Sequence, residues 1–115
     1  AFEATKKYSK KLNHGEAVLL GIICAINFAN REHTINKNDY KKIINHFKKL
    51  NLPMNIKKFF LKKNINKILS FVQKDKKNNN DKINLVLLNK IGKTNYNYQS
   101  RIPKIYKFFK NELIN

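Results

Sequence analysis

The chain has 115 residues, 42% of them hydrophobic, and carries a formal net charge of +18. Its length suits one domain with a single modest core, and its eight Phe and five Tyr argue against intrinsic disorder. The charge raises nucleic acids and anionic membranes as partners, but the lysines are spread along the chain instead of forming one block, which favours a compositional bias of the surface. We therefore predict one domain over residues 1–115, with neither a nucleic acid nor a membrane as its partner.

The first strong pattern is an apolar run over residues 17–29, interrupted mainly by Gly21 and Asn27. A surface helix shows a narrower apolar stripe, so this run predicts a buried central helix from about residue 14 to residue 31. The run is too short to span a bilayer, which takes about 20 residues, and the chain shows no signal-peptide pattern. Cys24 is the single cysteine, which excludes a disulfide within the chain, and we interpret it as a small buried hydrophobic residue.

A polar triplet of His14, Gly15 and Glu16 stands directly before this run, and Asn13 is a suitable N-cap. His14 is therefore predicted in the first turn, where its side chain can project into a cavity at that end of the helix. Glu16 lies about 200° round the helix from His14, so the two side chains cannot both point into one site. The carboxylate of Glu16 is instead predicted to stabilise the N-terminus of the helix. From the residues alone, a capping or surface histidine is preferred over a metal ligand at His14.

The next predicted element is an amphipathic helix with Asn36 as its N-cap. Apolar side chains recur at intervals of three and four residues, with lysines on the other face. The sequence N-L-P at residues 51–53 ends this helix. Residues 56–61 fit either a short helical turn or an extended segment, and both interpretations stay open. The apolar positions of the helix are Tyr40, Ile43, Ile44, Phe47 and Leu50.

The last part of the chain is predicted to contain two helices and one small strand pair. Asn64 is a suitable cap for the first helix, and residues 83–88 form a short apolar run whose Val and Ile content favours a strand. Gly92 would end a hairpin-like excursion, residues 96–100 are predicted to be a loop, and Pro103 opens the final helix. The predicted fold class is therefore mainly α, with one short β pair.

Three motifs follow one another in a specific order. The first is N-H-G-E-A-V at residues 13–18, and the second is L-N-L-P at residues 50–53. The third is D-K-K at residues 75–77, followed by I-N-L-V-L-L at residues 83–88 and I-G-K at residues 91–93. Each motif alone is weak, but the three in register resemble the C-terminal domain of the 3-dehydroquinate synthase family. The resemblance runs from residue 1 to about residue 93 and implies that the domain is truncated at its N-terminus.

The resemblance implies roles for three residues. His14, as the His of H-G-E, would be a metal ligand beside the substrate, with Zn²⁺ or Co²⁺ as the metal. Lys77 or Lys76 would bind the anionic substrate, because a lysine ammonium suits a phosphate or carboxylate as a point charge. Asp81 departs from the family pattern, which often has Gly there. The other metal ligands and the general acid–base histidine would lie upstream of Ala1, so no catalytic residue is assigned within the chain.

For function, the resemblance implies conversion of 3-deoxy-D-arabino-heptulosonate 7-phosphate to 3-dehydroquinate and phosphate, in the shikimate pathway to chorismate and the aromatic amino acids. NAD would transiently oxidise a ring hydroxyl that the metal polarises. The chain has no glycine-rich phosphate loop, so NAD would bind on an N-terminal α/β domain, and we expect the fragment to be inactive alone. A cytoplasmic enzyme is expected. The resemblance also suggests a homodimer, although the sequence itself does not determine the oligomeric state.

Two alternative functions stay open. One is another sugar-phosphate cyclase of the same superfamily, against which the D-K-K form of the third motif argues. The other is a basic helical nucleic-acid-binding module, which a steep loss of DNA affinity with increasing salt would support.

Overall fold

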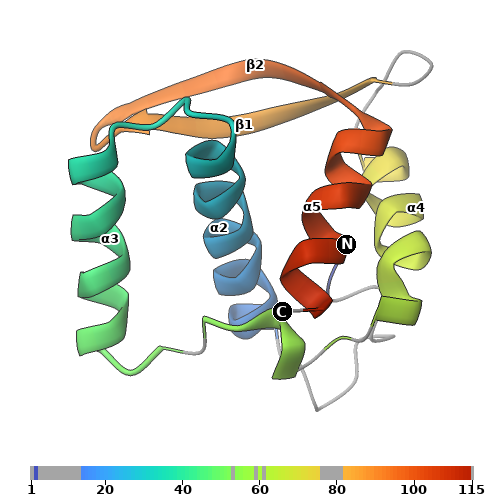
Figure 1. Ribbon diagram of the computed structural model, residues 1–115, viewed down its shortest axis with the longest axis horizontal. Coiled ribbons are helices and arrows are strands. Elements are labelled where there is room, and N and C mark those ends of the chain that lie inside the picture. Colours follow the sequence, from blue (N-terminus) through green and yellow to red (C-terminus); the bar gives the residue numbers. More distant parts are fainter. Residues whose placement is uncertain are drawn as a thin grey trace.

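The computed structural model describes residue 2 and residues 14–52, 54–58, 60, 62–75 and 82–114. In the described part, helices pack beside one another and a two-stranded antiparallel sheet lies across the C-terminal end of α2 (Figure 1). The prediction of a mainly helical chain with one β pair is thus confirmed. The elements are α2 (His14–Arg31), α3 (Lys37–Lys49), the 3-10 turns η1 (Ile56–Lys58) and η2 (Lys62–Asn64), α4 (Ile65–Asp75), β1 (Lys82–Lys90), β2 (Lys93–Arg101) and α5 (Ile102–Ile114).

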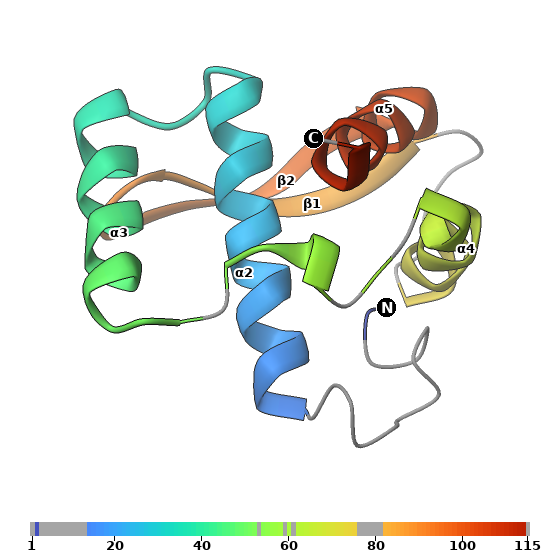
Figure 2. The same cartoon turned by 60° about the horizontal axis from the view of Figure 1, so that its bottom comes forward.

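Helix α2 is the central element and has the predicted bounds. It lies between α3 on one side and α4 and α5 on the other (Figure 2). Its buried face explains most of the apolar run, but Val18 and Ile22 are 48% and 47% exposed, so the run is not buried all round. These two residues are one turn apart and share a face that no described element covers. The buried residues of α2 are Ala17, Leu20, Ile23, Cys24, Ile26, Phe28 and Ala29.

Helix α3 begins at the predicted cap and is tied to the sheet. The Asn36 side-chain oxygen accepts hydrogen bonds from the backbone N–H groups of Asn38 and Asp39 at 2.8 and 3.4 Å. Tyr40 and Ile43 pack against the core, although no residue of α3 is fully buried. Leu50, which the pattern placed on the apolar face, is 55% exposed because it lies at the C-cap, where the helical periodicity ends. The chain leaves the helix through Asn51, whose φ of 55° is left-handed.

The sheet is a hairpin that the sequence predicts only in its first half. Strand β1 contains the predicted residues 83–88, and Gly92 occupies the turn with a φ of 86°. The loop predicted at residues 96–100 is wrong, because these residues belong to β2, which pairs with β1 along its length. Strand β2 mixes asparagines, which are depleted in strands, with Thr and Tyr, which favour them, and it is extended where it pairs with the apolar β1. Residues 56–58 form a helical turn, which resolves the open alternative for that part of the segment.

One hydrophobic cluster joins the described elements. Phe2 packs on Phe60 and Phe109, with ring centroids 5.0 and 6.1 Å apart. Strand β2 runs directly into α5, so the hairpin and α5 enclose the C-terminal half of α2 together. Among the helices of the described residues, none combines the length and the apolar character needed to cross a membrane. The least exposed large side chains of the cluster are Leu20, Phe60, Ile65, Ile68 and Leu87.

Candidate functional site

His14 is the first residue of α2, as predicted, and its side chain is exposed. Glu16 lies in the same first turn and is partly buried. The buried face of α2 begins at Ala17, so the core holds the helix while its first turn reaches the surface. This arrangement places the imidazole at the exposed N-terminal end of α2.

The described residues do not form a complete metal site. They contain no group of three or more His, Cys, Asp and Glu side chains arranged to hold a metal ion. A catalytic zinc ion takes three protein ligands and keeps one position open. The assignment of His14 as a metal ligand stays a prediction. His33 lies in the turn after α2 and His46 lies on α3, and both are exposed.

The predicted substrate lysines cannot be placed relative to His14. Lys76 and Lys77 lie outside the described residues, as do Asn13 and Asp81. In the chain they follow directly on Asp75, the last residue of α4, and precede β1. The assignment of either lysine to the substrate stays a prediction.

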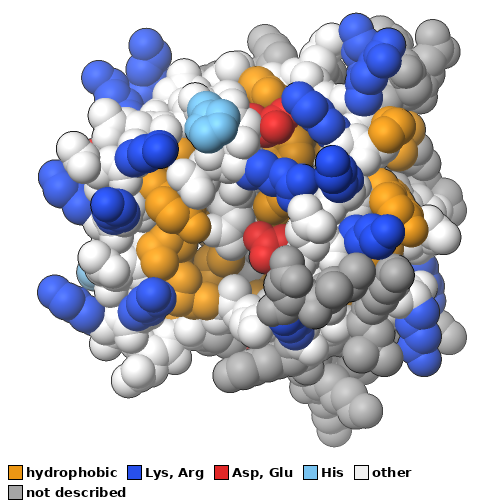
Figure 3. Space-filling model, in the orientation of Figure 1, with side chains coloured by type: hydrophobic (Ala, Val, Ile, Leu, Met, Phe, Trp, Pro, Cys, Tyr) orange, Lys and Arg blue, Asp and Glu red, His pale blue; other side chains and the backbone are white. Residues whose placement is uncertain are grey.

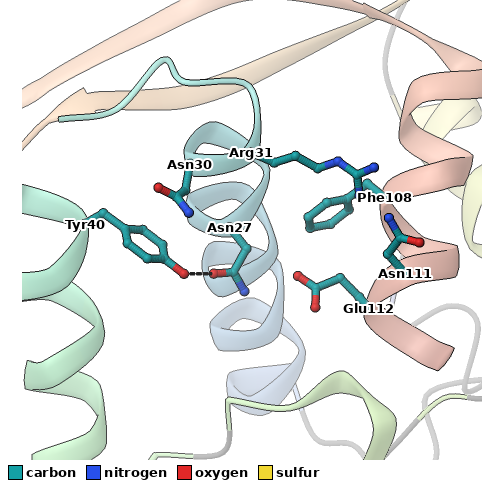
Figure 4. A pocket seen from close by; sticks show the side chains of 7 residues that line it. All are labelled: Asn27, Asn30, Arg31, Tyr40, Phe108, Asn111 and Glu112. Atoms are coloured by element: carbon teal, nitrogen blue, oxygen red, sulfur yellow. Dashed lines mark hydrogen bonds between the residues drawn. The ribbon is translucent and has the colours of Figure 1, made fainter. Parts of the chain in front are cut away.

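A polar cavity lies between α2, α3 and α5, and sequence reasoning did not find it. Its volume is about 370 Å³, and its side chains converge from three elements (Figure 4). The Tyr40 hydroxyl donates a hydrogen bond of 2.8 Å to the side-chain oxygen of Asn27, which fixes the amide of Asn27. The one sequence signal was Asn27 itself, a polar residue inside an apolar run. The lining residues are Asn27, Asn30, Arg31, Tyr40, Phe108, Asn111 and Glu112.

Glu112 is the acidic side chain among the lining residues of this cavity. Burial raises the pKa of its carboxyl group, while the charges of Arg31 and Lys57 act in the opposite direction. Burial, together with the charge of Glu112, also raises the pKa of the Tyr40 hydroxyl and that of the Cys24 thiol. Cys24 is therefore a buried, protonated thiol, which agrees with its interpretation as a small hydrophobic residue and not as a nucleophile.

Basic side chains are spread over the surface. Figure 3 shows Lys and Arg distributed around the whole of one face instead of gathered in one block. Tyr98 and Lys104 both contact Glu32, through a hydrogen bond of 3.2 Å and an ion pair of 2.7 Å. The surface seen in this view does not have the single basic stripe that is typical of a nucleic-acid interface.

Comparison with known proteins identifies the family. A family model described as 3-dehydroquinate synthase C-terminal matches residues 1–78. The 3-dehydroquinate synthase of Pelagibacter ubique (strain HTCC1062) is 51% identical over 113 residues, which are 98% of this chain and 31% of that protein. The enzyme of the same name from Staphylococcus carnosus (strain TM300) is 38% identical over 87 residues, 76% of this chain and 23% of that protein. That from Zymomonas mobilis (subsp. mobilis, strain ZM4) is 28% identical over 113 residues, 98% of this chain and 30% of that protein.

The chain thus spans less than a third of the length of these relatives. No solved structure is significantly similar to it. The matched segment contains the H-G-E motif of His14 and also Lys76 and Lys77, whereas the apolar block of the third motif lies beyond it. The resemblance drawn from the motifs is confirmed, and the chain belongs to the 3-dehydroquinate synthase family, whose C-terminal part it matches.

Proposed function

We propose that this chain is part of an enzyme that converts 3-deoxy-D-arabino-heptulosonate 7-phosphate to 3-dehydroquinate and inorganic phosphate in the shikimate pathway. The observation that carries the proposal is the family match over residues 1–78, which includes the H-G-E motif. The relatives compared above all have the name 3-dehydroquinate synthase, which favours this reaction over that of another sugar-phosphate cyclase. The exposed His14 at the start of a helix with one buried face supports it, because a metal ligand needs both access and a fixed position.

His14 is the residue of the described part to which we give a direct role. Its neutral imidazole supplies one ligand to Zn²⁺ or Co²⁺, and the buried face of α2 holds that ligand in place. When bound, the metal acts as a Lewis acid on the substrate and NAD carries out the transient oxidation. The glycines of the described part, Gly15, Gly21 and Gly92, are isolated, so NAD binding is assigned to another part of the full-length enzyme.

Lys77 or Lys76 binds the phosphate or carboxylate of the substrate in this proposal. A lysine ammonium is a compact point charge that attracts either group. Two separate variants, Lys76→Gln and Lys77→Gln, assign the contact to one residue. We expect a raised KM for the substrate in the variant that lacks the contacting lysine. In the other variant the KM should stay close to the wild-type value.

The proposal is tested on the full-length protein by following phosphate release and, separately, bound metal. We expect His14→Ala to lower phosphate release by at least about 100-fold, because a Lewis-acid metal contributes several kcal/mol to the transition state. We also expect the variant to retain less metal after dialysis. His46→Ala is the matched control, since His46 is an exposed histidine on a helix and has no role in the proposal. Unchanged phosphate release and metal content in His14→Ala would contradict the assignment.

The 115-residue chain alone is proposed to be inactive. Its described part offers one metal ligand, and the rest of the site is assigned to the remainder of the full-length enzyme. The same phosphate-release measurement on the isolated chain checks this directly. Measurable turnover by the isolated chain would show that it contains the whole site.

A further inference from the structure

Two cavities share Asn27 and Glu112 as lining residues and together form the feature named here the Glu112 groove. The first is the cavity of about 370 Å³ that also contains Arg31 and Tyr40. The second has a volume of about 240 Å³ and a more apolar lining, contributed by α2 and by the segment around η1. Volumes of this size suit a small molecule. The apolar residues of the second cavity are Ile23, Cys24, Met54 and Ile56.

Glu112 lines both cavities. Among the described residues it accepts no hydrogen bond and forms no ion pair. A partly buried carboxylate can only accept hydrogen bonds, and leaving it without a donor is costly. Burial raises its pKa, which is the sign of this cost. The position therefore suits a ligand that brings a positively charged donor.

Arg31 supplies the opposite charge on the other side of the groove. The side-chain amide of Asn111 can be oriented so that both its oxygen and its nitrogen have suitable hydrogen-bond partners. In this orientation its oxygen accepts hydrogen bonds from the two terminal nitrogens of Arg31 at 2.7 and 3.0 Å. This contact fixes the guanidinium and leaves it with further N–H donors. Figure 4 shows Glu112 extending from α5 toward Asn27 on α2, and Arg31 extending from α2 toward Asn111 on α5. A fixed cation and an anion without a direct partner among the described residues thus line the same space.

The charges around the groove select the kind of ligand. A simple cation would pair with Glu112 but would meet the positive charges of Arg31 and Lys57. A simple anion would pair with Arg31 but would meet Glu112. A molecule that carries an ammonium and a carboxylate a few bonds apart satisfies both groups at once. The apolar lining of the second cavity adds room for an aliphatic side chain.

We propose that the Glu112 groove binds a free α-amino acid with an apolar side chain, with its ammonium on Glu112 and its carboxylate on Arg31. Tyr40 and Asn27 provide further polar lining. The Tyr40 hydroxyl donates a hydrogen bond to the side-chain oxygen of Asn27, so the amide nitrogen of Asn27 remains as a donor for the ligand. The groove lies along the second half of α2, whereas His14 begins the helix. The inference does not rest on the proposed synthase reaction and is tested by binding alone.

The test uses titration calorimetry on the full-length protein, with L-leucine and then L-methionine as probes. We expect saturable binding of one molecule per chain for at least one of them. Two analogues of leucine test the contribution of each charged group to binding: 3-methylbutylamine lacks the carboxylate, and 4-methylpentanoate lacks the ammonium. Each should bind at least about tenfold more weakly than the amino acid, because each loses a charge-assisted hydrogen bond.

Substitutions then assign the contacts. Glu112→Gln and Arg31→Gln should each raise the Kd of the amino acid by at least about tenfold, whereas Glu32→Gln, which alters a carboxylate already paired with Lys104, should leave it unchanged. Circular dichroism confirms that each variant is folded, and Arg31→Lys replaces Arg31→Gln if the latter is not. The proposal is overturned if neither amino acid binds, if 4-methylpentanoate binds as tightly as leucine, or if Glu112→Gln binds like the wild type.

Discussion

The two halves of α2 differ in how their neighbours hold them. In the second half, Phe28 packs edge-to-face on Phe108 and Tyr98, and Asn27 and Arg31 are fixed by contacts from α3 and α5. In the first half, His14 and Gly15 are exposed, and Val18 and Ile22 are nearly half exposed. One helix thus combines an anchored half with an accessible half. The anchored half ties α2 to its neighbours, and the accessible half presents the family motif at the surface.

The largest expected effect comes from breaking the anchored half. Phe28 is 4% exposed and contacts two aromatic rings, at centroid distances of 5.3 and 6.4 Å. Phe28→Ala should lower the free energy of unfolding by about 3–5 kcal/mol, because it removes a large buried side chain and leaves a cavity. Urea unfolding measures the loss. Val18→Ala is the control in the accessible half and should cost less than about 1 kcal/mol. Similar losses in the two variants would show that the halves do not differ.

A smaller effect is expected where α3 begins beside the anchored half. The Asn36 side chain caps α3, and its backbone N–H donates to the carbonyl oxygen of Asn89 on β1 at 3.0 Å. Asn36→Ala removes the side-chain cap alone and should lower the free energy of unfolding by about 1 kcal/mol. Asn38→Ala, an exposed asparagine in the first turn of the same helix, is the matched control. A loss in Asn38→Ala equal to that in Asn36→Ala would argue against the cap.

The smallest effect is a pH dependence at Glu112. Because burial raises its folded pKa above the unfolded value, its contribution to stability is fully present below the unfolded pKa and is lost as the pH rises through the folded pKa. Glu112→Gln should therefore gain thermal stability relative to the wild type as the pH rises from below the ordinary pKa of a carboxyl group to above the raised pKa of Glu112. Arg31 and Lys57 reduce the effect, since their charges favour the ionised carboxylate. A Tm difference that does not change over this interval would contradict the assignment.

Local patterns predicted most of the fold. The apolar run predicted α2, the spacing of apolar residues and Asn36 predicted α3, and Pro103 predicted the start of α5. Strand β2 was missed because its asparagines suggested a loop, although its Thr and Tyr residues favour a strand and it pairs with β1. The exposed face of α2 was missed because an apolar run does not specify which neighbours cover it.

The candidate site, like the fold, could be predicted only where its residues are close together in the sequence. The motif around His14 is local in sequence and could be found from it, and the family it indicated is confirmed. The Glu112 groove could not be found, because Asn27, Tyr40 and Glu112 lie on three helices and meet only in the folded chain. Lys76 and Lys77 lie outside the described residues, and their role stays a prediction, as do the metal, NAD, the homodimer and the cytoplasmic location.

The direct junction between β2 and α5 has a consequence for the order of folding. Arg101 ends the strand and Ile102 begins the helix, so α5 is placed by a hairpin that must first close around Gly92. Contacts between residues distant in the chain form slowly, because the intervening segment loses entropy before they are made. We therefore expect the early helix–helix contacts of α2 and α3 to form before α5 docks. Hydrogen exchange during refolding should then show amides of α2 protected earlier than those of α5.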